Sequence, residues 1–61
     1  MKNGSPVVQI ESKEYKMLRL WRVTIRLKDG TKFSGYESAL LYATRAAIRR
    51  MQEGDAEKWY S

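Results

Sequence analysis

The feature that most constrains the fold is an alternation of apolar and polar residues that leads into a glycine turn. It covers seven consecutive residues, Trp21, Arg22, Val23, Thr24, Ile25, Arg26 and Leu27. A period of two predicts a β-strand that buries one of its faces, and we expect this strand to span residues 17–27. The Lys28-Asp29-Gly30 segment that follows predicts a tight turn into a second, antiparallel strand.

The length of this turn decides which side chains of the hairpin share a face. A two-residue loop at Asp29-Gly30 would place Phe33, the single phenylalanine of the chain, on the polar face with Arg26. A three-residue loop, with Gly30 as the left-handed bulge residue, pairs Ile25 with Phe33 and keeps the apolar residues together. We predict the second register. Its polar face carries two further cross-strand pairs, Arg26 with Lys32 and Thr24 with Ser34.

Segments on either side of the hairpin complete the expected elements. Residues 7–11 are short and β-branched and predict a first strand, and the polar residues 12–16 predict an irregular connection. Residues 37–53 predict a helix that ends at Gly54. Ser34 and Glu37 match a capping box at the start of this helix, and Ser38 is a competing N-cap.

The predicted helix is amphipathic and rich in alanine. Its sheet-facing stripe recurs at helical spacing and consists of Leu40, Ala43, Ala47 and Met51, flanked by Leu41, Thr44 and Ile48. Its opposite side carries Tyr42, Arg45, Arg49 and Gln52. Small alanine side chains let a helix lie close on a sheet. The expected fold is therefore α+β, with a three-stranded antiparallel sheet followed by one packed helix (β-β-β-α) in two layers.

The length of 61 residues allows one domain with a thin core. We expect a single domain over residues 1–61, with a flexible lead-in at 1–6 and a tail at 55–61. The chain has no Cys and no His, so neither disulfides nor an ordinary zinc site can reinforce it, and a homodimer is a natural remedy. Apolar runs are far shorter than a membrane span, so we expect a cytoplasmic protein without membrane contact.

The formal charge of +5 is unevenly distributed along the chain. Residues 16–50 hold nine basic side chains against two acidic ones. The end of the chain holds Glu53, Asp55 and Glu57, in what we expect to be a solvated tail. This excess of positive charge on the folded middle indicates an anionic partner.

The basic residues form two groups that could bind a nucleic-acid backbone. The first comprises Arg22, Arg26 and Lys32 on the polar face of the hairpin, with Lys28 at the turn; the second comprises Arg45 and Arg49 on the helix. Cations that alternate with hydroxyl residues can contact phosphates, and a two-stranded ribbon fits a DNA major groove. The plain alternative is that Lys and Arg are routine on any solvent-facing strand or helix. We favour a small non-enzymatic nucleic-acid-binding module, such as an accessory protein of a phage or mobile element.

A competing hypothesis is a phage-type modulator or inhibitor that binds an acidic host or defence protein. Its anchors would be Tyr42, Trp59 and Tyr60, with the arginines around them. Tyr15 and Tyr36 also allow stacking on unpaired bases, although such aromatic residues more often close the rim of a thin core. Trp21 has the parity of the buried face, so we assign it to the core.

Catalysis is disfavoured by the composition. Without His or Cys, the usual general base, thiol nucleophile and metal ligands are missing, and the seven acidic residues are dispersed. Arg, Lys and Tyr can support RNA cleavage by stabilising a phosphate, but no paired acid and base can be named here. We therefore expect no enzyme activity, no cofactor and no bound metal.

The stretch from Trp21 to Met51, a hairpin followed by a helix rich in Ala, resembles the second half of a double-stranded-RNA-binding domain. The Lys-Lys-x-Ala-Lys pattern of that family is replaced here by Glu37-Ser38-Ala39-Leu40-Leu41, and its amino-terminal helix is missing. Three strands followed by a helix also resemble, in topology, the arm-site-binding domains of some phage and transposon integrases. The first resemblance implies duplex RNA as a ligand, and the second implies DNA bound by the sheet. We assign the chain to neither family.

Overall fold

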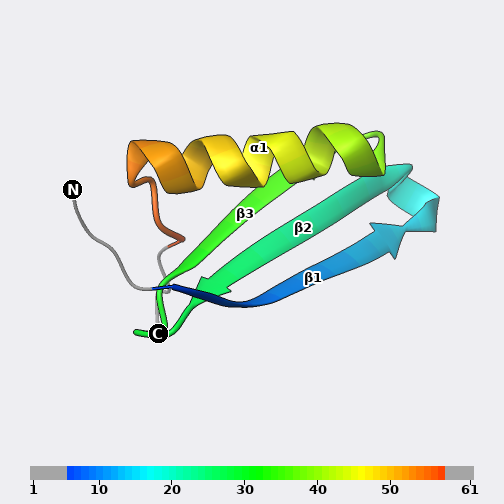
Figure 1. Cartoon of the computed structure of the whole chain (residues 1–61). Helices are drawn as coiled ribbons and strands as arrows, with labels where there is room; N and C mark the ends of the chain where they lie inside the picture. Colours follow the sequence, from blue (N-terminus) through cyan, green and yellow to red (C-terminus); the bar gives the residue numbers. More distant parts are fainter. Residues whose placement is uncertain (1–5, 58–61) are drawn as a thin grey trace.

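The computed structural model describes residues 6–57, which form three strands and one helix (Figure 1). The elements in chain order are β1 (Val7–Tyr15), the 3-10 turn η1 (Lys16–Leu18), β2 (Leu20–Leu27), β3 (Lys32–Glu37) and α1 (Leu40–Glu53). The strands form one antiparallel sheet in the order β1-β2-β3, and α1 packs on one face of it against β3 and β2. This arrangement confirms the expected α+β fold with β-β-β-α order and two layers.

The turn between β2 and β3 has the three-residue form that the sequence predicts. Gly30 is left-handed, with φ +92°, and its N–H donates to the Leu27 carbonyl over 3.0 Å. The Leu27 N–H donates to the Thr31 carbonyl over 2.9 Å. Ile25 pairs with Phe33, and the Phe33 side chain is buried. The other predicted pairs, Arg26 with Lys32 and Thr24 with Ser34, are confirmed as well.

The first strand is longer than predicted. β1 continues through residues 12–15, expected to be an irregular connection, and it pairs with β2 up to Tyr15 opposite Leu20. The ladder to β2 pairs the backbone groups of this polar segment that face β2, and the outer backbone groups and the side chains can stay in solvent because β1 is an edge strand. The chain then turns through η1 and Arg19, which is left-handed with φ 51°, so β2 begins at Leu20 rather than at Met17.

The helix starts later than predicted. Its N-cap is Ala39 rather than Ser34 or Ser38, and it spans residues 40–53 instead of 37–53. Ser34 and Glu37 both belong to β3, so their side chains are not available to the first turn of the helix. The predicted end is confirmed, because Gly54 is left-handed, with φ +73°, and its N–H bonds to carbonyl groups of the last turn.

The core is small and lies between α1 and the β2–β3 hairpin. Its buried hydrophobic members are Val23, Ile25, Phe33, Ala43 and Ala47, and the partly buried Trp21, Leu27 and Met51 pack around it. At Gly35 an added methyl carbon would lie 2.4 Å from the Ala43 carbonyl oxygen and 2.4 Å from the Ala47 nitrogen. Only glycine fits at this position beneath the helix. The predictions that Trp21 contributes to the core and that the alanines permit a close approach are confirmed.

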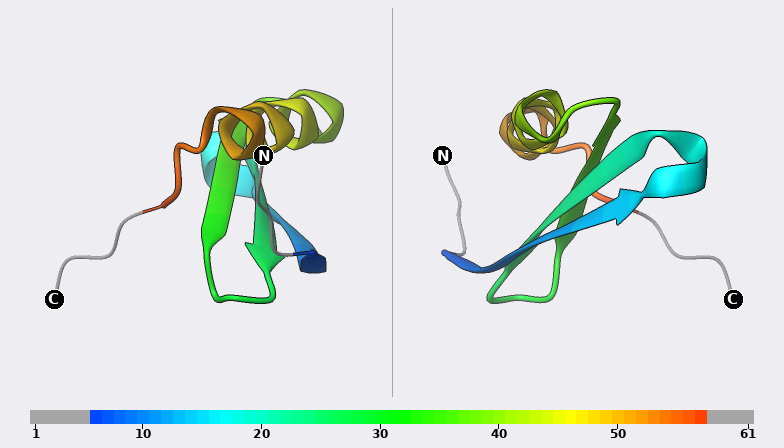
Figure 2. Two further views of the ribbon diagram at one scale, coloured as in Figure 1. Left: turned by 60° about the vertical axis from the view of Figure 1, so that its left-hand side comes forward. Right: turned by 90° about the vertical axis from the view of Figure 1, so that its right-hand side faces the viewer.

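The helix covers β2 and β3 and leaves the neighbouring face of β1 open (Figure 2). Part of the predicted sheet-facing stripe is therefore exposed: Leu40 is 41% exposed, Leu41 60% and Ile48 38%. On the open face of β1, Ile10 is 63% exposed. The prediction that these three residues pack on the sheet is wrong. Because α1 lies over β3 and β2, no strand lies directly beneath their side of the helix.

One residue of the predicted flexible lead-in is bonded to the hairpin. The Pro6 carbonyl accepts a hydrogen bond from the Lys28 N–H over 3.0 Å. Residues 1–5 of the lead-in lie outside the described residues. The start of β1 is thus attached to the β2–β3 turn as well as to β2.

Candidate nucleic-acid interface

The sheet face that is turned away from α1 is the candidate nucleic-acid interface, and we call it the outer face. The parity that buries Ile25 and Phe33 against the helix sends the intervening residues to this side. Its side chains are Gln9, Glu11, Lys13 and Tyr15 of β1, Leu20, Arg22, Thr24 and Arg26 of β2, and Lys32, Ser34 and Tyr36 of β3. The cations predicted on the polar face of the hairpin, Arg22, Arg26 and Lys32, all belong to it.

Antiparallel pairing sorts the outer face into rows that run across the strands. One row joins Gln9, Arg26 and Lys32, the next joins Glu11, Thr24 and Ser34, and a third joins Lys13, Arg22 and Tyr36. Two cationic rows therefore lie on either side of a row that holds a carboxylate and two hydroxyl groups. Arg22 and Arg26 are four residues apart on β2, which corresponds to about 13 Å along a strand. The two cationic rows are therefore separate centres of positive charge.

Glu57 reaches this face instead of lying in solvent as expected, whereas Glu53 and Asp55 are exposed. The Glu57 N–H donates to the Lys32 carbonyl over 2.7 Å, and the Ser34 hydroxyl donates to the Glu57 carboxylate. The Ser34 and Thr24 hydroxyl oxygens are 3.1 Å apart and hydrogen-bonded. Glu57 is thereby held at the edge of β3, and Ser34, although it faces outward, is buried.

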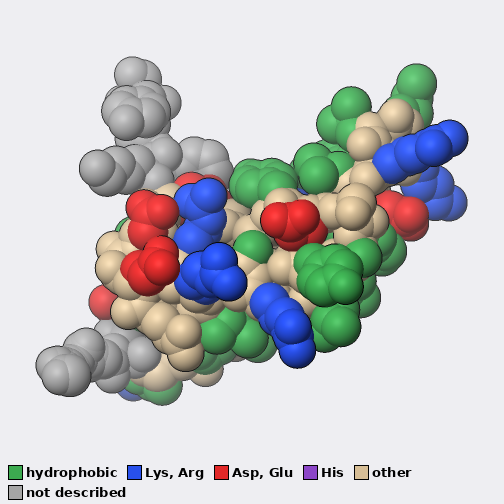
Figure 3. All heavy atoms as spheres, turned by 90° about the horizontal axis from the view of Figure 1, so that it is seen from above, with side chains coloured by type: hydrophobic (Ala, Val, Ile, Leu, Met, Phe, Trp, Pro, Cys, Tyr) green, Lys and Arg blue, Asp and Glu red, His purple; other side chains and the backbone are tan. Residues whose placement is uncertain are grey.

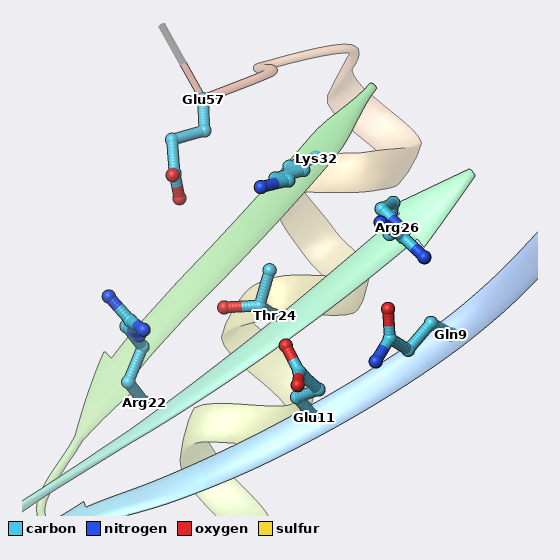
Figure 4. Close-up of a pocket in the computed structure, with 7 residues that line it drawn as sticks. All are labelled: Gln9, Glu11, Arg22, Thr24, Arg26, Lys32 and Glu57. Atoms are coloured by element: carbon cyan, nitrogen blue, oxygen red, sulfur yellow. The ribbon is translucent and has the colours of Figure 1, made fainter. Parts of the chain in front are cut away.

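A shallow hollow occupies the middle of the outer face (Figure 4). It is lined by Gln9, Glu11, Arg22, Thr24, Arg26, Lys32 and Glu57. Its two carboxylates lie at opposite edges, Glu11 on β1 and Glu57 beyond β3, while the basic side chains lie toward the two ends of the strands. A chain of phosphates would be attracted at these ends and repelled at the edges.

Arg22, like Lys32, is half-buried, whereas Arg26 is exposed. A hydrogen bond to Tyr36 raises the pKa of Arg22 above its ordinary value, burial acts weakly in the opposite direction, and Tyr15 and Glu57 add to the rise. Arg22 is therefore a permanent cation. Its guanidinium carbon lies 5.9 Å from the centre of the Tyr15 ring, and the Lys13 ammonium lies 5.2 Å from the same centre. These distances are typical of cation–π contacts.

The remaining predicted residues lie elsewhere. Lys28 is exposed in the β2–β3 turn, and Arg45 and Arg49 are exposed on α1, where they line a shallow hollow with Glu37, Tyr42 and Ala46. Seen from the helix side, the surface mixes basic, acidic and hydrophobic side chains (Figure 3). The helix cations and the outer face belong to different layers, so they do not form one continuous surface. Trp59 and Tyr60, the other predicted anchors, lie outside the described residues.

Sequence reasoning missed several residues of the outer face. Lys13 and Tyr15 were placed in a connection because β1 was expected to end at residue 11. The length of β2 could have indicated a longer β1 that includes them, since a long strand needs a partner of similar length to satisfy its backbone groups. No local signal places Glu57 here, because its contacts to β3 join residues far apart in the sequence.

Comparison with protein-family models, with curated proteins and with solved structures found no match for this chain. Among residues 6–57, no helix has the length and apolar character needed to cross a membrane. The chemistry of the outer face is therefore the basis for a functional proposal.

Proposed function

We propose that this chain is a non-enzymatic module that binds the phosphate backbone of a nucleic acid on the outer face. One observation carries the proposal: a sheet face left open by the helix presents four basic side chains in two rows, Lys13, Arg22, Arg26 and Lys32. Basic side chains are the usual partners of phosphate oxygens. Phosphate contacts carry no direct sequence information, so binding would depend mainly on charge.

The proposal sets the expected salt dependence. Release of counterions from four neutralised phosphates gives a slope of log affinity against log salt of about −3.6 for duplex DNA and about −2.8 for single strands. Changing Arg22→Gln and Arg26→Gln together removes two contacts and should halve the slope. The matched control, Arg45→Gln with Arg49→Gln, removes the same charge from α1 and should leave the slope unchanged.

Fluorescence anisotropy with labelled random-sequence DNA and RNA over a series of salt concentrations measures these slopes. Far-UV circular dichroism of each variant checks that the fold is kept. Binding that does not vary with salt contradicts the proposal. A helix variant that loses as much slope as the sheet variant would move the interface to α1.

A second candidate function is the binding of an acidic protein partner by the helix. The observation that favours it is the exposure of Tyr42 beside Arg45 and Arg49 at one hollow, where an aromatic anchor is surrounded by cations. This candidate gains if wild-type protein fails to bind any nucleic acid at low salt. In that case the Arg45→Gln/Arg49→Gln variant becomes the one expected to lose its partner.

A further inference from the structure

Two tyrosines of the outer face take no part in the core. Tyr36 is 47% exposed, and Tyr15 is partly exposed at the end of β1. Both point away from α1, because Tyr36 pairs with Arg22 and Tyr15 pairs with Leu20 on the outer side of the sheet. The common role of tyrosine, closing the rim of a thin core, therefore does not explain either side chain.

The two rings flank one cation. Tyr36 lies on β3 and Tyr15 on β1, so β2 with Arg22 runs between them, and strands two apart in a sheet are about 10 Å apart. Arg22 makes a cation–π contact of 5.9 Å with the Tyr15 ring, and it pairs with Tyr36 across the strands and bonds to the Tyr36 hydroxyl group. Aromatic faces beside a fixed guanidinium are the recurrent elements of surfaces that bind unpaired nucleotides.

We propose that the ligand of the outer face is single-stranded nucleic acid, with bases stacked on Tyr15 and Tyr36 and phosphates held by Arg22 and the other cations. This inference rests on the proposed function and narrows its ligand class. In a duplex each base is already stacked on its neighbours, so the rings would have no free base to receive. In a single strand the base faces are available.

The surroundings of the hairpin also favour a single strand. A two-stranded ribbon can enter a major groove if both of its edges are free. Here β1 lies along one edge of the hairpin, and residues 55–57 lie along the other, with Glu57 bonded to Lys32 and Ser34. The hairpin is thus bordered on both sides and forms part of a wider platform. The cation–π contacts of Tyr15 do not prevent stacking, because exposed contacts of this kind are weaker than a stacked base.

The test compares three probes of about twelve units at one low salt concentration: oligothymidylate, an abasic strand with the same phosphates, and a duplex. Wild-type protein should bind oligothymidylate at least about 10-fold more tightly than the abasic strand. Tyr36→Ala should weaken binding of oligothymidylate by about 5- to 150-fold, the range for one lost stacked base, and should change binding of the abasic strand no more than Tyr36→Phe does. Tyr15→Ala should act in the same direction.

Two further variants separate stacking from other effects. Tyr36→Phe keeps the ring and loses the hydroxyl group that bonds to Arg22, so it should keep the preference of the wild-type protein for oligothymidylate over the abasic strand. Tyr42→Ala removes an exposed tyrosine from α1 and should change nothing. Tyr36 is exposed, so its variants should fold, and thermal unfolding checks this. If Tyr15→Ala unfolds, the comparison of Tyr36→Ala with Tyr36→Phe is sufficient to test stacking.

The outcomes distinguish the two proposals. Equal binding of all three probes, with no effect of Tyr36→Ala, overturns stacking and leaves the phosphate interface intact. Preference for the duplex also overturns the single-strand inference. Absence of binding to every probe at low salt overturns the proposed function itself.

Discussion

The β2–β3 hairpin and β1 belong to one sheet, yet they differ in how they are held. In the hairpin, Val23 is 1% exposed and Ile25 2%, because α1 covers them. In β1, Val8 is 53% exposed and Ile10 63%, although Ile10 lies directly beside Ile25 on the same side of the sheet. Burial therefore depends on where the helix lies and not on the apolar character of a strand.

The position of the helix follows from the smallest side chains of the core. Ala43 and Ala47 lie over Gly35, so the backbones of α1 and β3 approach closely. A helix drawn down onto β3 in this way covers about two strands, since strands are about 4.8 Å apart and a helix is about 10 Å wide. The third strand is left as an open edge.

The largest expected effect comes from disrupting the contact between α1 and β3 at Gly35. Gly35→Ala places a methyl carbon 2.4 Å from backbone atoms of Ala43 and Ala47, and backbone cannot rotate away as a side chain does. The helix must move off the sheet, so we expect a loss of about 4 kcal/mol or more in the free energy of unfolding. Urea denaturation followed by circular dichroism measures it.

The control for this change is Gly54→Ala. A methyl group at Gly54 meets no atom within 4 Å, but the left-handed φ of +73° costs a non-glycine residue about 1 kcal/mol. Equal losses for the two variants would contradict close approach as the reason for glycine at position 35.

The next effect sharpens the contrast between the two strands with one matched pair. Ile25→Ala removes a buried side chain and should cost about 3 kcal/mol, whereas Ile10→Ala removes an exposed one and should cost less than about 1 kcal/mol. Both residues are isoleucines on the same side of the sheet, so their difference isolates the cover that α1 provides. A large loss at Ile10 would mean that another surface covers β1 in solution; analytical ultracentrifugation of wild-type protein would then reveal the predicted homodimer.

The smallest effect concerns the outer face. Its hollow has Glu57 at the edge beyond β3 and Glu11 at the edge formed by β1. Glu57→Gln removes one negative charge near Arg22 and keeps an oxygen that can accept from Ser34. Nucleic-acid affinity should rise by about 2- to 5-fold, as expected for one exposed charge pair. Glu53→Gln, on the helix, is the control, and the same gain there would show that net charge alone is responsible.

The pairing of the hairpin could be predicted in detail because the burial of one apolar residue, Phe33, distinguishes between the two possible loop lengths. Only one loop length buries Phe33, and that length fixes every pair from Arg26–Lys32 onward. The same register places Ser34 opposite Thr24 inside a strand. The capping box at Ser34 and Glu37 was therefore incompatible with it, and the long-range pairing outweighed the local motif.

For the candidate site, the sequence predicted only the cations of the central strand β2 and Lys32 on β3. The alternation of β2 indicated Arg22 and Arg26, whereas Lys13 and Tyr15 depended on the full length of β1. A polar edge strand carries no hydrophobic pattern, because neither of its faces is covered. Glu57 depended on the path of the chain after Gly54, which follows from tertiary contacts and not from local propensity.

β1 is held mainly by hydrogen bonds to one neighbour and buries little side-chain surface, so we expect it to open locally while the hairpin and α1 stay folded. Amide protons of β1 then exchange with solvent through local opening, at a lower free energy than those of β2. Each opening also removes Lys13 and Tyr15 from the outer face. A bound nucleic-acid strand that contacts these side chains would keep β1 paired with β2. Amide exchange in β1 would therefore slow as more of the outer face is occupied.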